Sequence, residues 1–442
     1  MRRPPARRIG LLAGGKSLPI EIADSLIARG VPVHVVALEG EAGEDIERFS
    51  PTWVNWGQIG KIIASFKKAQ CEKIVIAGSV NRPDLSAIKP DFGLLRAIPT
   101  VLRLMRVGGD DAILRGVVAY LKSFGLEIIG VSEIAPELLV APGVFAGPSE
   151  SLMDHGDIGL GFEVLEALAR FDVGQAVVTS AGQVVAIEAA EGTDRMLERL
   201  TARRHLLLRD GKTVARGFLI KAPKAGQDLR VDLPAIGPQT VRAVAAADLN
   251  GIAVEGKRVL ALERSSLSAM AETHRVSVVG FEKDDQRVTR GKRTVADRAS
   301  GEDAQSIRLE GIRRLGRCRM PKAAWNDVMR GAGVITALET YGVGQAVIVA
   351  RRHVLAVEAG EGVADAVARA SSLRQWGKGF WSRRIGVAVF SAGRDLTPEI
   401  VSQVADAGMA GICVVLRKFS ASVRSDIIEE ADRRKLFIVG LE

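Results

Sequence analysis

Alternating charges mark the stretch of residues 221–240, which reads KAPKAGQDLRVDLPAIGPQT. Asp228, Arg230 and Asp232 are each separated by one aliphatic residue. Alternation at period two predicts a strand that places all three charged side chains on one face. Neighbours along that face would lie about 6.5–7 Å apart, so two carboxylates could serve one bound cation or one reacting phosphate. A polar edge strand that carries an ordinary salt bridge is the alternative interpretation.

The residues around these charges supply counter-charges and element boundaries. Lys221 and Lys224 lie just upstream, where ammonium groups would balance a bound anion. Downstream, Pro234 and Pro238 predict the end of the strand and the first turn of a helix over residues 241–249. The stretch is therefore a candidate anion-binding or catalytic segment between two regular elements.

Composition predicts a globular protein of two to four domains. The 442 residues are 47% hydrophobic and 26% charged, as in ordinary folded domains. The aromatic content of 5% argues against a sugar-stacking lectin or a single-strand nucleic-acid binder. Three cysteines lie far apart, at Cys71, Cys318 and Cys413, which fits a reducing cytoplasm and offers no zinc-site spacing.

Net charge and hydropathy limit the partners. The net charge of +9 admits nucleic acid, anionic lipid or a phosphorylated substrate. No stretch combines a basic helix with a nucleic-acid motif, so we expect no nucleic-acid partner. No window reaches the apolar length of a membrane span, and residues 9–13 are too short for a signal peptide. The sequence predicts a cytoplasmic protein, soluble or attached to the inner membrane only at its surface.

A Rossmann-like α/β domain with a parallel sheet is predicted over residues 1–135. A strand over residues 9–13 runs into Gly14 and Gly15, and Ser17 is suited to cap a helix over residues 19–28. Backbone N–H groups and the helix dipole at such a junction favour an anion. A match to the P-loop pattern is rejected because its variable positions belong to the strand, and the dinucleotide pattern G-x-G-x-x-G is absent.

A second loop of this domain follows the strand predicted over residues 73–77. Gly78 and Ser79 begin the sequence GSVNRPDL, which places polar groups at the carboxyl end of a strand, where open α/β sheets bind ligands. The helix predicted over residues 94–107 could line an acyl chamber or touch a membrane, although packing on the sheet is the commoner role.

Two further domains are predicted, over residues 150–283 and 306–442, with an exposed charged linker over 283–305. They form a repeat. GQAV recurs at Gly174 and Gly344, and EAxEG recurs at Glu188 and Glu358. Both pairs are 170 residues apart (344 − 174 and 358 − 188), a spacing that we call the repeat offset. The first copy contains a hairpin around residues 180–182 and an acidic cluster after it. In the second copy Asp232 has no counterpart. That domain is expected to be structural or regulatory, packed on its parent or taking the place of a self-associating partner.

Together these motifs resemble a known family. LLAGGKSLP, GSVNRPDL, GGDDAIL, DVGQAVV, EAAEGTD and KAPKAGQDLRVDLPAIGPQTV, spread over about residues 8–283, are similar to the UDP-2,3-diacylglucosamine pyrophosphatases of many α-proteobacteria. The resemblance implies a step of lipid A biosynthesis, the hydrolysis of UDP-2,3-diacylglucosamine to UMP and 2,3-diacylglucosamine 1-phosphate. It also implies dependence on a divalent cation such as Mg²⁺, with Asp232 as the essential aspartate. The third domain departs from the family as an additional, degenerate copy.

The residues and the resemblance together give a candidate site. Asp232 is expected to hold the metal, with Asp228 and Lys221 as further catalytic residues, since magnesium prefers carboxylates combined with substrate phosphate. The candidate substrate contacts are Gly14, Gly15, Gly78, Ser79, Arg82, Asp111, Gln175, Thr193, Asp194, Lys224 and Arg230. Two other classes stay open: a nucleotide-sugar phosphoryl or glycosyl transferase, and a non-catalytic nucleotide-sugar-binding regulator.

Overall fold

The chain divides into two units. The computed structural model describes residues 8–80, 91, 93, 110–149, 155–203, 208–209, 212–213, 216–224, 226–282, 311–373, 384–391, 395–416 and 423–442. Unit 1 comprises residues 1–145, 226–239 and 255–270, and unit 2 comprises residues 146–225, 240–254 and 271–442. The helix predicted over residues 94–107 and the linker predicted over 283–305 lie outside the described residues.

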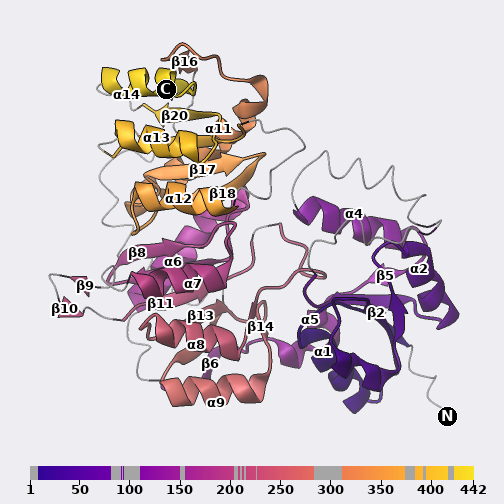
Figure 1. Cartoon of the computed structure of the whole chain (residues 1–442). Helices are drawn as coiled ribbons and strands as arrows, with labels where there is room; N and C mark the ends of the chain where they lie inside the picture. The colour runs from indigo at the N-terminus through magenta and orange to yellow at the C-terminus, as the bar shows by residue number, and fades with distance from the viewer. Residues whose placement is uncertain are drawn as a thin grey trace. The chain divides into compact units, whose positions relative to one another are not determined.

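Unit 1 is built on a five-stranded parallel sheet in the order β3-β2-β1-β4-β5 (Figure 1). The strands are β1 (Ile9–Ala13), β2 (Val33–Leu38), β3 (Thr52–Val54), β4 (Lys73–Ala77) and β5 (Glu127–Ile128). The helices are α1 (Leu18–Ala28), α2 (Ile59–Lys68), α4 (Asp110–Lys122) and α5 (Val131–Ile134). Unit 1 also contains a short pair of parallel strands, β12 (Ala235–Ile236) and β14 (Leu260–Ala261).

The sheet of unit 1 is buried on both faces, which explains its unbroken apolar strands. Along β1, Leu11 belongs to one core cluster and Leu12 to another, because successive side chains point to opposite faces. All five residues of β1 are buried for this reason. Parallel sheets covered by helices on both sides have such continuous hydrophobic runs, so the predicted α/β class with an N-terminal parallel sheet is confirmed.

The repeat forms two six-stranded mixed sheets of identical topology, which belong largely to unit 2. The orders are β6-β15-β13-β11-β7-β8 and β16-β21-β20-β19-β17-β18, each followed along the chain in the same sequence of helices and strands (Figure 1). The first sheet consists of β6 (Gly143–Ala146), β7 (Ala176–Ser180), β8 (Gln183–Ile187), β11 (Phe218–Lys221), β13 (Gly251–Glu255) and β15 (Ser277–Phe281). The second consists of β16 (Ile312–Arg314), β17 (Ala346–Ala350), β18 (His353–Val357), β19 (Val387–Ser391), β20 (Gly411–Val415) and β21 (Phe437–Leu441).

The helices of the two copies correspond in the same way. In the first copy they are α6 (His155–Leu168), α7 (Thr193–Ala202), α8 (Pro238–Ala246) and α9 (Arg264–His274). In the second copy they are α11 (Trp325–Leu338), α12 (Val363–Leu373), α13 (Pro398–Asp406) and α14 (Ser425–Arg433). The repeat inferred from one constant offset is thus a repeat of whole elements.

A buried aspartate fixes the same hairpin in both copies. Residues 181 and 182, between β7 and β8, have φ of 52° and 73°, as a tight two-residue hairpin turn requires. Asp157 accepts hydrogen bonds from the N–H groups of both residues, at 2.8 and 2.6 Å. Asp327 does the same for Arg351 and Arg352 in the second copy. The hairpin predicted around residues 180–182 is confirmed, and its carboxylate clamp belongs to the scaffold.

The copies differ in the length of one connection. In the first copy β11 ends at Lys221 and α8 begins at Pro238, whereas in the second β19 ends at Ser391 and α13 begins at Pro398. Residues 226–239 of the longer connection belong to unit 1, as do residues 255–270, which follow β13. The second copy retains Asp395 as the sequence counterpart of Asp228 but lacks the part of the segment that carries Arg230 and Asp232.

Within unit 2 the copies pack on each other. One core cluster draws Val164, Leu168 and Val177 from the first copy and Val328, Leu338 and Val347 from the second. Helices α6 and α11 are in contact across this shared core. None of the described helices has the length and apolar character to cross a membrane.

Candidate functional site

The segment that carries the alternating charges is a turn, so the predicted strand is wrong. The N–H groups of Val231 and Asp232 both donate to the carbonyl oxygen of Asp228, each at 3.0 Å. The carboxylate of Asp228 also accepts from the N–H and the guanidinium of Arg230, at 2.6–3.1 Å. Aspartate favours such side-chain-to-backbone bonds, which compete with strand pairing. The three charges consequently do not share the face of a strand.

Arg230 and Asp228 form an ion pair in which the guanidinium donates hydrogen bonds to both oxygens of the carboxylate. Hydrogen bonding to Asp228 raises the pKa of Arg230 above its ordinary value, because the pair favours the charged guanidinium. A carboxylate held in this fork-like geometry is a less suitable metal ligand than a carboxylate with an open oxygen. The salt bridge considered as the alternative interpretation is present, but on a turn.

Asp232 lies on the same turn, half-buried, and accepts a hydrogen bond from the side-chain amide of Gln227. The turn is anchored in unit 1, since Val231 and Leu233 pack against the two core clusters of the parallel sheet. A Cβ at Gly130 would come within 3.3 Å of the Cα of Arg230. Gly130 closely follows β5, so the turn sits at the carboxyl edge of the sheet.

The two glycine loops of unit 1 pair with each other. Gly14 donates to the carbonyl of Ala77 at 2.8 Å, while Gly15 and Ser79 exchange two backbone hydrogen bonds of 2.7 and 3.0 Å. A Cβ at Gly14 would lie 2.6 Å from the carbonyl oxygen of Ser79. These N–H groups therefore do not point at a ligand, contrary to the expectation from the sequence. The glycines permit the close approach of two loops.

The helix junction after β1 also differs from the expectation. Ser17 has helical φ and ψ, and its side chain makes no capping hydrogen bond to α1. Lys16 instead takes a left-handed conformation with φ of 67°. Ser17 remains close to the turn, since its carbonyl accepts from the N–H groups of Ile20 and Glu21.

The position of these loops in the sheet agrees with a ligand site. In the order β3-β2-β1-β4-β5, the chain proceeds from β1 to one side and later returns to the other side through β4. Ligands of open α/β sheets bind at the carboxyl ends of the two strands where the order reverses. Residues 14–15 follow β1 and residues 78–79 follow β4, so both loops lie at this switch point.

Two candidate contacts of unit 1 cannot be placed. Arg82 lies outside the described residues, and Asp111 belongs to α4 without a described side chain. Their predicted contact with substrate stays a prediction.

In unit 2, Lys221 begins a series of hydrogen-bonded polar groups that are buried or half-buried. Its ammonium donates to the hydroxyl of Thr193 at 3.1 Å, and that hydroxyl lies 3.3 Å from an oxygen of Glu188, to which it donates. The other oxygen of Glu188 accepts from the N–H of Gln175 at 2.8 Å. Lys221 is only 9% exposed, and a buried ammonium requires such partners. The structure thus brings together three sequence-predicted residues, Lys221, Thr193 and Gln175.

The remaining candidates of unit 2 lie near this series of groups. Lys224 forms an ion pair of 2.8 Å with Asp172, and Asp194 is an exposed residue in the first turn of α7. Gln175 links the two regions, because its carbonyl accepts from the N–H of Ala222.

The second copy provides an internal comparison for these groups. Lys221 lies opposite Ala176 in the ladder of β11 and β7, and Phe390 lies opposite Ala346 in the equivalent ladder. Phe390 therefore occupies the position of Lys221. At the repeat offset, Thr193 corresponds to Val363. Both replacements are apolar and belong to one core cluster of the second copy.

Other polar groups are the same in both copies. Glu358 accepts from the N–H of Gln345 at 3.0 Å as Glu188 does from Gln175. Groups that both copies retain hold the fold, whereas Lys221 and Thr193 are present only in the copy with the longer connection. This difference separates the residues that are candidates for chemistry from those of the scaffold.

Glu358 belongs to the copy in which the lysine is replaced by phenylalanine. Burial raises its pKa to about 7, and the nearby carboxylates of Glu361 and Asp395 add to the shift, while hydrogen bonds from the backbone of Gln345 and Gly344 act in the opposite direction. Desolvation disfavours the charged form of a buried carboxyl. The second copy therefore folds with a carboxyl group that binds its proton more tightly than an unfolded chain does.

This shift predicts a pH-dependent stability. Because the folded pKa lies above the ordinary value of 4.5, stability falls as pH rises from about 4.5 to about 7 and stays level above that range, by roughly 3 kcal/mol in total. Glu358→Gln should remove this part of the dependence, measured as thermal unfolding of both proteins from pH 4.5 to 8. The exposed Glu429→Gln is the control. A stability difference between Glu358→Gln and wild type that does not change with pH would contradict the assignment.

No preformed metal cage is visible: the described residues contain no group of three His, Cys, Asp or Glu side chains arranged to hold an ion. Magnesium, however, is commonly bound through one or two carboxylates together with substrate phosphates and water. Asp232 offers one such carboxylate on an anchored turn. The described donor set fits a metal that is completed by the substrate.

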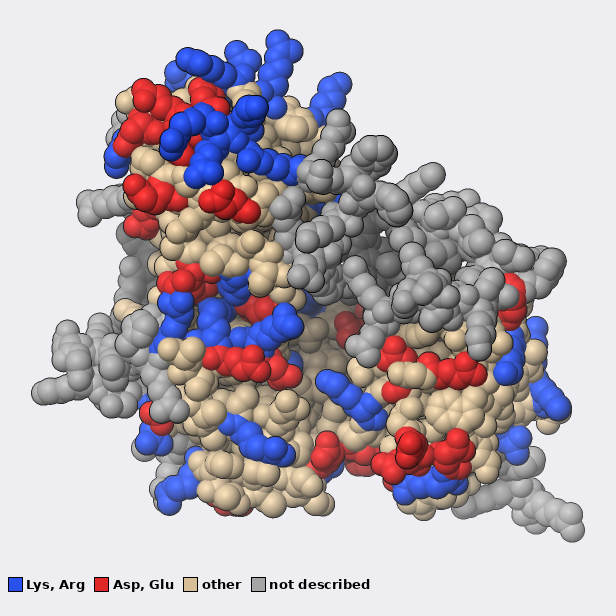
Figure 2. Space-filling view, in the orientation of Figure 1, with Lys and Arg blue, Asp and Glu red and all other residues tan. Residues whose placement is uncertain are grey.

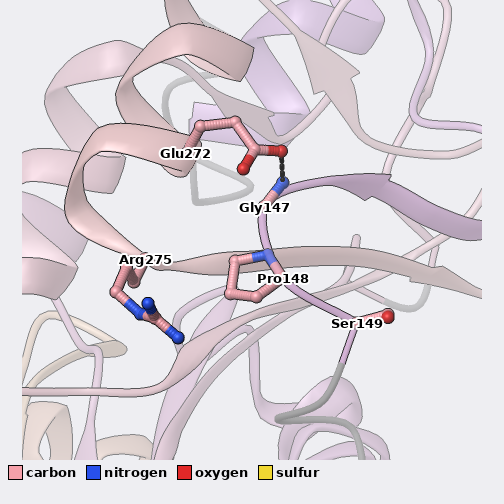
Figure 3. A pocket seen from close by; sticks show the side chains of 5 residues that line it. All are labelled: Gly147, Pro148, Ser149, Glu272 and Arg275. Carbon is pink, nitrogen blue, oxygen red and sulfur yellow. Dashed lines mark hydrogen bonds between the residues drawn. The ribbon is translucent and has the colours of Figure 1, made fainter.

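Two other surface features are weaker candidates for a functional site. A hollow in unit 2 is lined by residues 147–149, Glu272 and Arg275, and the carboxylate of Glu272 accepts from the N–H of Gly147 at 3.2 Å (Figure 3). It contains none of the predicted site residues. Over α13 and α14, basic and acidic side chains lie side by side (Figure 2), as in the ion pair between Arg434 and Asp406. Such mixed surfaces contribute little to binding.

Sequence reasoning did not select Gln227, Glu188 or Asp172. Gln227 is buried and donates a hydrogen bond to Asp232. Nothing in the sequence around it indicates this contact. Glu188 could have been recognised as structural, because the second copy retains it as Glu358 at the repeat offset. Asp172 becomes Gly342 at the same offset, so its pairing with Lys224 is specific to the first copy.

Comparison with known proteins agrees with both the fold and the repeat. Residues 8–138 match the LpxI N-terminal domain, and the LpxI C-terminal domain matches over two segments, residues 141–279 and 313–439. The UDP-2,3-diacylglucosamine pyrophosphatase LpxI of Caulobacter vibrioides is 36% identical over 277 residues, which are 62% of this chain and 98% of that protein. That relative is thus too short to contain both segments. The chain belongs to the LpxI family, with a second copy of the family's C-terminal domain.

Proposed function

We propose that this protein hydrolyses the pyrophosphate bond of UDP-2,3-diacylglucosamine in lipid A biosynthesis. The products are UMP and 2,3-diacylglucosamine 1-phosphate, since water adds to one phosphorus and the bridging oxygen leaves with the other. The proposal is supported by the match to a pyrophosphatase of that name over nearly the whole length of the relative. The observation that carries it in the structure is the loss of Lys221 and Thr193, together with the Asp232 segment, from the second copy alone.

The cations of the candidate site fit the charge of this substrate. A pyrophosphate diester carries two negative charges, and more charge develops on the leaving phosphate, so positioned cations lower the barrier. We assign this role to Lys221 and Arg230. Asp228, which holds the guanidinium of Arg230, is then a positioning residue.

We assign Asp232 as the ligand of a divalent cation such as Mg²⁺. A bound divalent cation would neutralise phosphate oxygens and polarise the reacting phosphorus. Gln227 orients the carboxylate of Asp232 through its amide, as groups next to metal ligands commonly do.

The nucleotide is assigned to the switch point of unit 1. Residues 14–15 and 78–79 lie where a parallel sheet offers a ligand crevice. Since the N–H groups of Gly14 and Gly15 are engaged, we expect the exposed hydroxyl of Ser79 to contact the ligand. The diacyl substrate is a lipid, and we propose that the protein meets it at the inner-membrane surface.

Ser79→Ala should weaken UMP binding about tenfold, because one hydrogen bond to a charged group contributes roughly 1.5 kcal/mol. Isothermal titration calorimetry with UMP measures the effect. Gly15→Val is a poorer test, since a Cβ there would lie 2.9 Å from the carbonyl of Glu41 and strain the paired loops. Ser123→Ala, at the amino edge of the same sheet, is the control. Unchanged UMP affinity in Ser79→Ala would place the nucleotide elsewhere.

An acceptor-free turnover assay tests the proposed function. The purified full chain is incubated with UDP-2,3-diacylglucosamine and Mg²⁺, with and without EDTA, and products are identified by mass spectrometry. Hydrolysis predicts UMP and the sugar 1-phosphate, formed only when the divalent cation is present. Turnover that needs an added alcohol would indicate a transferase, and binding without turnover would indicate a regulator.

A further inference from the structure

Four buried charges join the two copies of the repeat. Glu191 and Arg199 come from the first copy, and Glu361 and Arg369 are their counterparts in the second at the repeat offset. The four ion-pair distances lie between 2.5 and 3.1 Å. Exposure of the side chains is 14% for Arg199, 9% for Arg369, 3% for Glu191 and 0% for Glu361. We call these residues the charge tetrad.

The charge tetrad is reciprocal. Arg199 binds Glu191 of its own copy and Glu361 of the other, while Arg369 binds Glu361 of its own copy and Glu191 of the other. Each arginine also lies within hydrogen-bond distance of the equivalent strand carbonyl, that of Ile187 or that of Val357. Such exchange of roles is the signature of a two-fold, isologous interface, in which residue i meets j and j meets i.

The tetrad is the polar centre of a larger contact. The apolar core beside it combines residues of both copies, with α6 packed against α11. The guanidinium of Arg330 donates to the carbonyl of Phe171 at 2.8 Å, and the N–H of Gly360 donates to the carbonyl of Val185 at 3.1 Å. The first copy thus presents an apolar face with a self-complementary pair of charges, and the second copy covers it.

We propose that this face of the first copy is a self-association surface, whose partner is a second copy of the same domain. The repeat supplies that partner within the chain, so the molecule is a fused pseudo-dimer. This inference is independent of the hydrolytic reaction and of the residues assigned to it. If it holds, two first copies from different chains can form the same ion pairs with each other as the first and second copies of one chain do.

Charge exchange within one copy tests this consequence in the full chain. The double variant Glu191→Arg with Arg199→Glu keeps the ion pair inside the first copy. The guanidinium introduced at position 191 then faces Arg369, and the carboxylate introduced at position 199 faces Glu361. Like charges therefore repel each other between the two copies of one chain. Pairing of two exchanged first copies, or of two second copies, remains complementary. We therefore expect the double variant to shift from the association state of the wild type to a dimer, measured by analytical ultracentrifugation at micromolar concentration.

A quadruple variant provides the matched control. Adding Glu361→Arg and Arg369→Glu restores every opposite-charge contact and should return the chain to the wild-type association state. A double variant that aggregates or unfolds without forming a dimer, while the quadruple variant is folded, would overturn the proposal, because it shows only that the charges are coupled within one chain. A double variant with the association state and melting temperature of the wild type would overturn it. Failure of the quadruple variant to restore the wild-type state would do the same.

Discussion

Asp232→Asn is expected to lower kcat by roughly 10³-fold while leaving UMP affinity nearly unchanged. The substitution keeps the shape of the side chain but removes the negative charge of the carboxylate that we propose as the metal ligand. The turn should persist, because the hydrogen bonds from the N–H groups of Val231 and Asp232 to the carbonyl of Asp228 do not involve this carboxylate. Steady-state kinetics with UDP-2,3-diacylglucosamine, together with UMP titration and circular dichroism, measure the three quantities.

The second copy supplies the control for this substitution. Asp395, the sequence counterpart of Asp228, lies in the shorter connection before α13. Asp395→Asn should leave kcat unchanged, since that copy lacks the segment with Asp232. A near-wild-type kcat in Asp232→Asn would remove this residue from the reaction, whatever the result for Asp395.

Lys221→Met should reduce kcat/KM by about 10²-fold with no loss of thermal stability. The lysine places an ammonium in a nearly closed environment at the end of β11, and burial of a charge costs stability unless partners compensate. The second copy has Phe390 at this position in its core, so the fold itself accepts an apolar side chain. A positive charge retained against this cost is expected to serve an anionic substrate.

Kinetics and thermal unfolding of the same samples separate the two roles of Lys221. Lys68→Met, on the exposed last turn of α2, is the control for the removal of one positive charge. Thr193→Val, which introduces the residue type of the second copy, should show a smaller loss of kcat/KM than Lys221→Met. If Lys221→Met lowers the melting temperature strongly and leaves kcat/KM intact, the lysine is structural.

Much of the architecture could be predicted from the sequence because apolar runs and turn residues are local signals. The strand of residues 9–13 was predicted at its full length, since every position is buried by the two-sided sheet. The hairpin at residues 180–182 was equally clear from its turn chemistry. The constant repeat offset predicted a repeated domain from the sequence alone. The two six-stranded sheets share one topology, which agrees with that prediction.

The candidate site was less accessible because its geometry depends on contacts distant in sequence. Alternation of Asp228, Arg230 and Asp232 has the period of a strand, yet a side-chain bond between the first two closes a turn. That turn packs beside Gly130, far earlier in the chain. The hydrogen bonds from the N–H groups of Gly14 to Ala77 and of Gly15 to Ser79 likewise leave no local pattern in the sequence. Local periodicity cannot report such tertiary partners.

Hydrolysis in ¹⁸O-labelled water tests directly whether this protein cleaves the pyrophosphate bond of UDP-2,3-diacylglucosamine with water. The full chain is incubated with UDP-2,3-diacylglucosamine and Mg²⁺ without an alcohol acceptor, and both products are analysed by mass spectrometry. We expect equal amounts of UMP and 2,3-diacylglucosamine 1-phosphate, with one ¹⁸O atom incorporated per bond cleaved, and about 10³-fold slower incorporation by Asp232→Asn. Absence of cleavage, or products that carry no label, would contradict it.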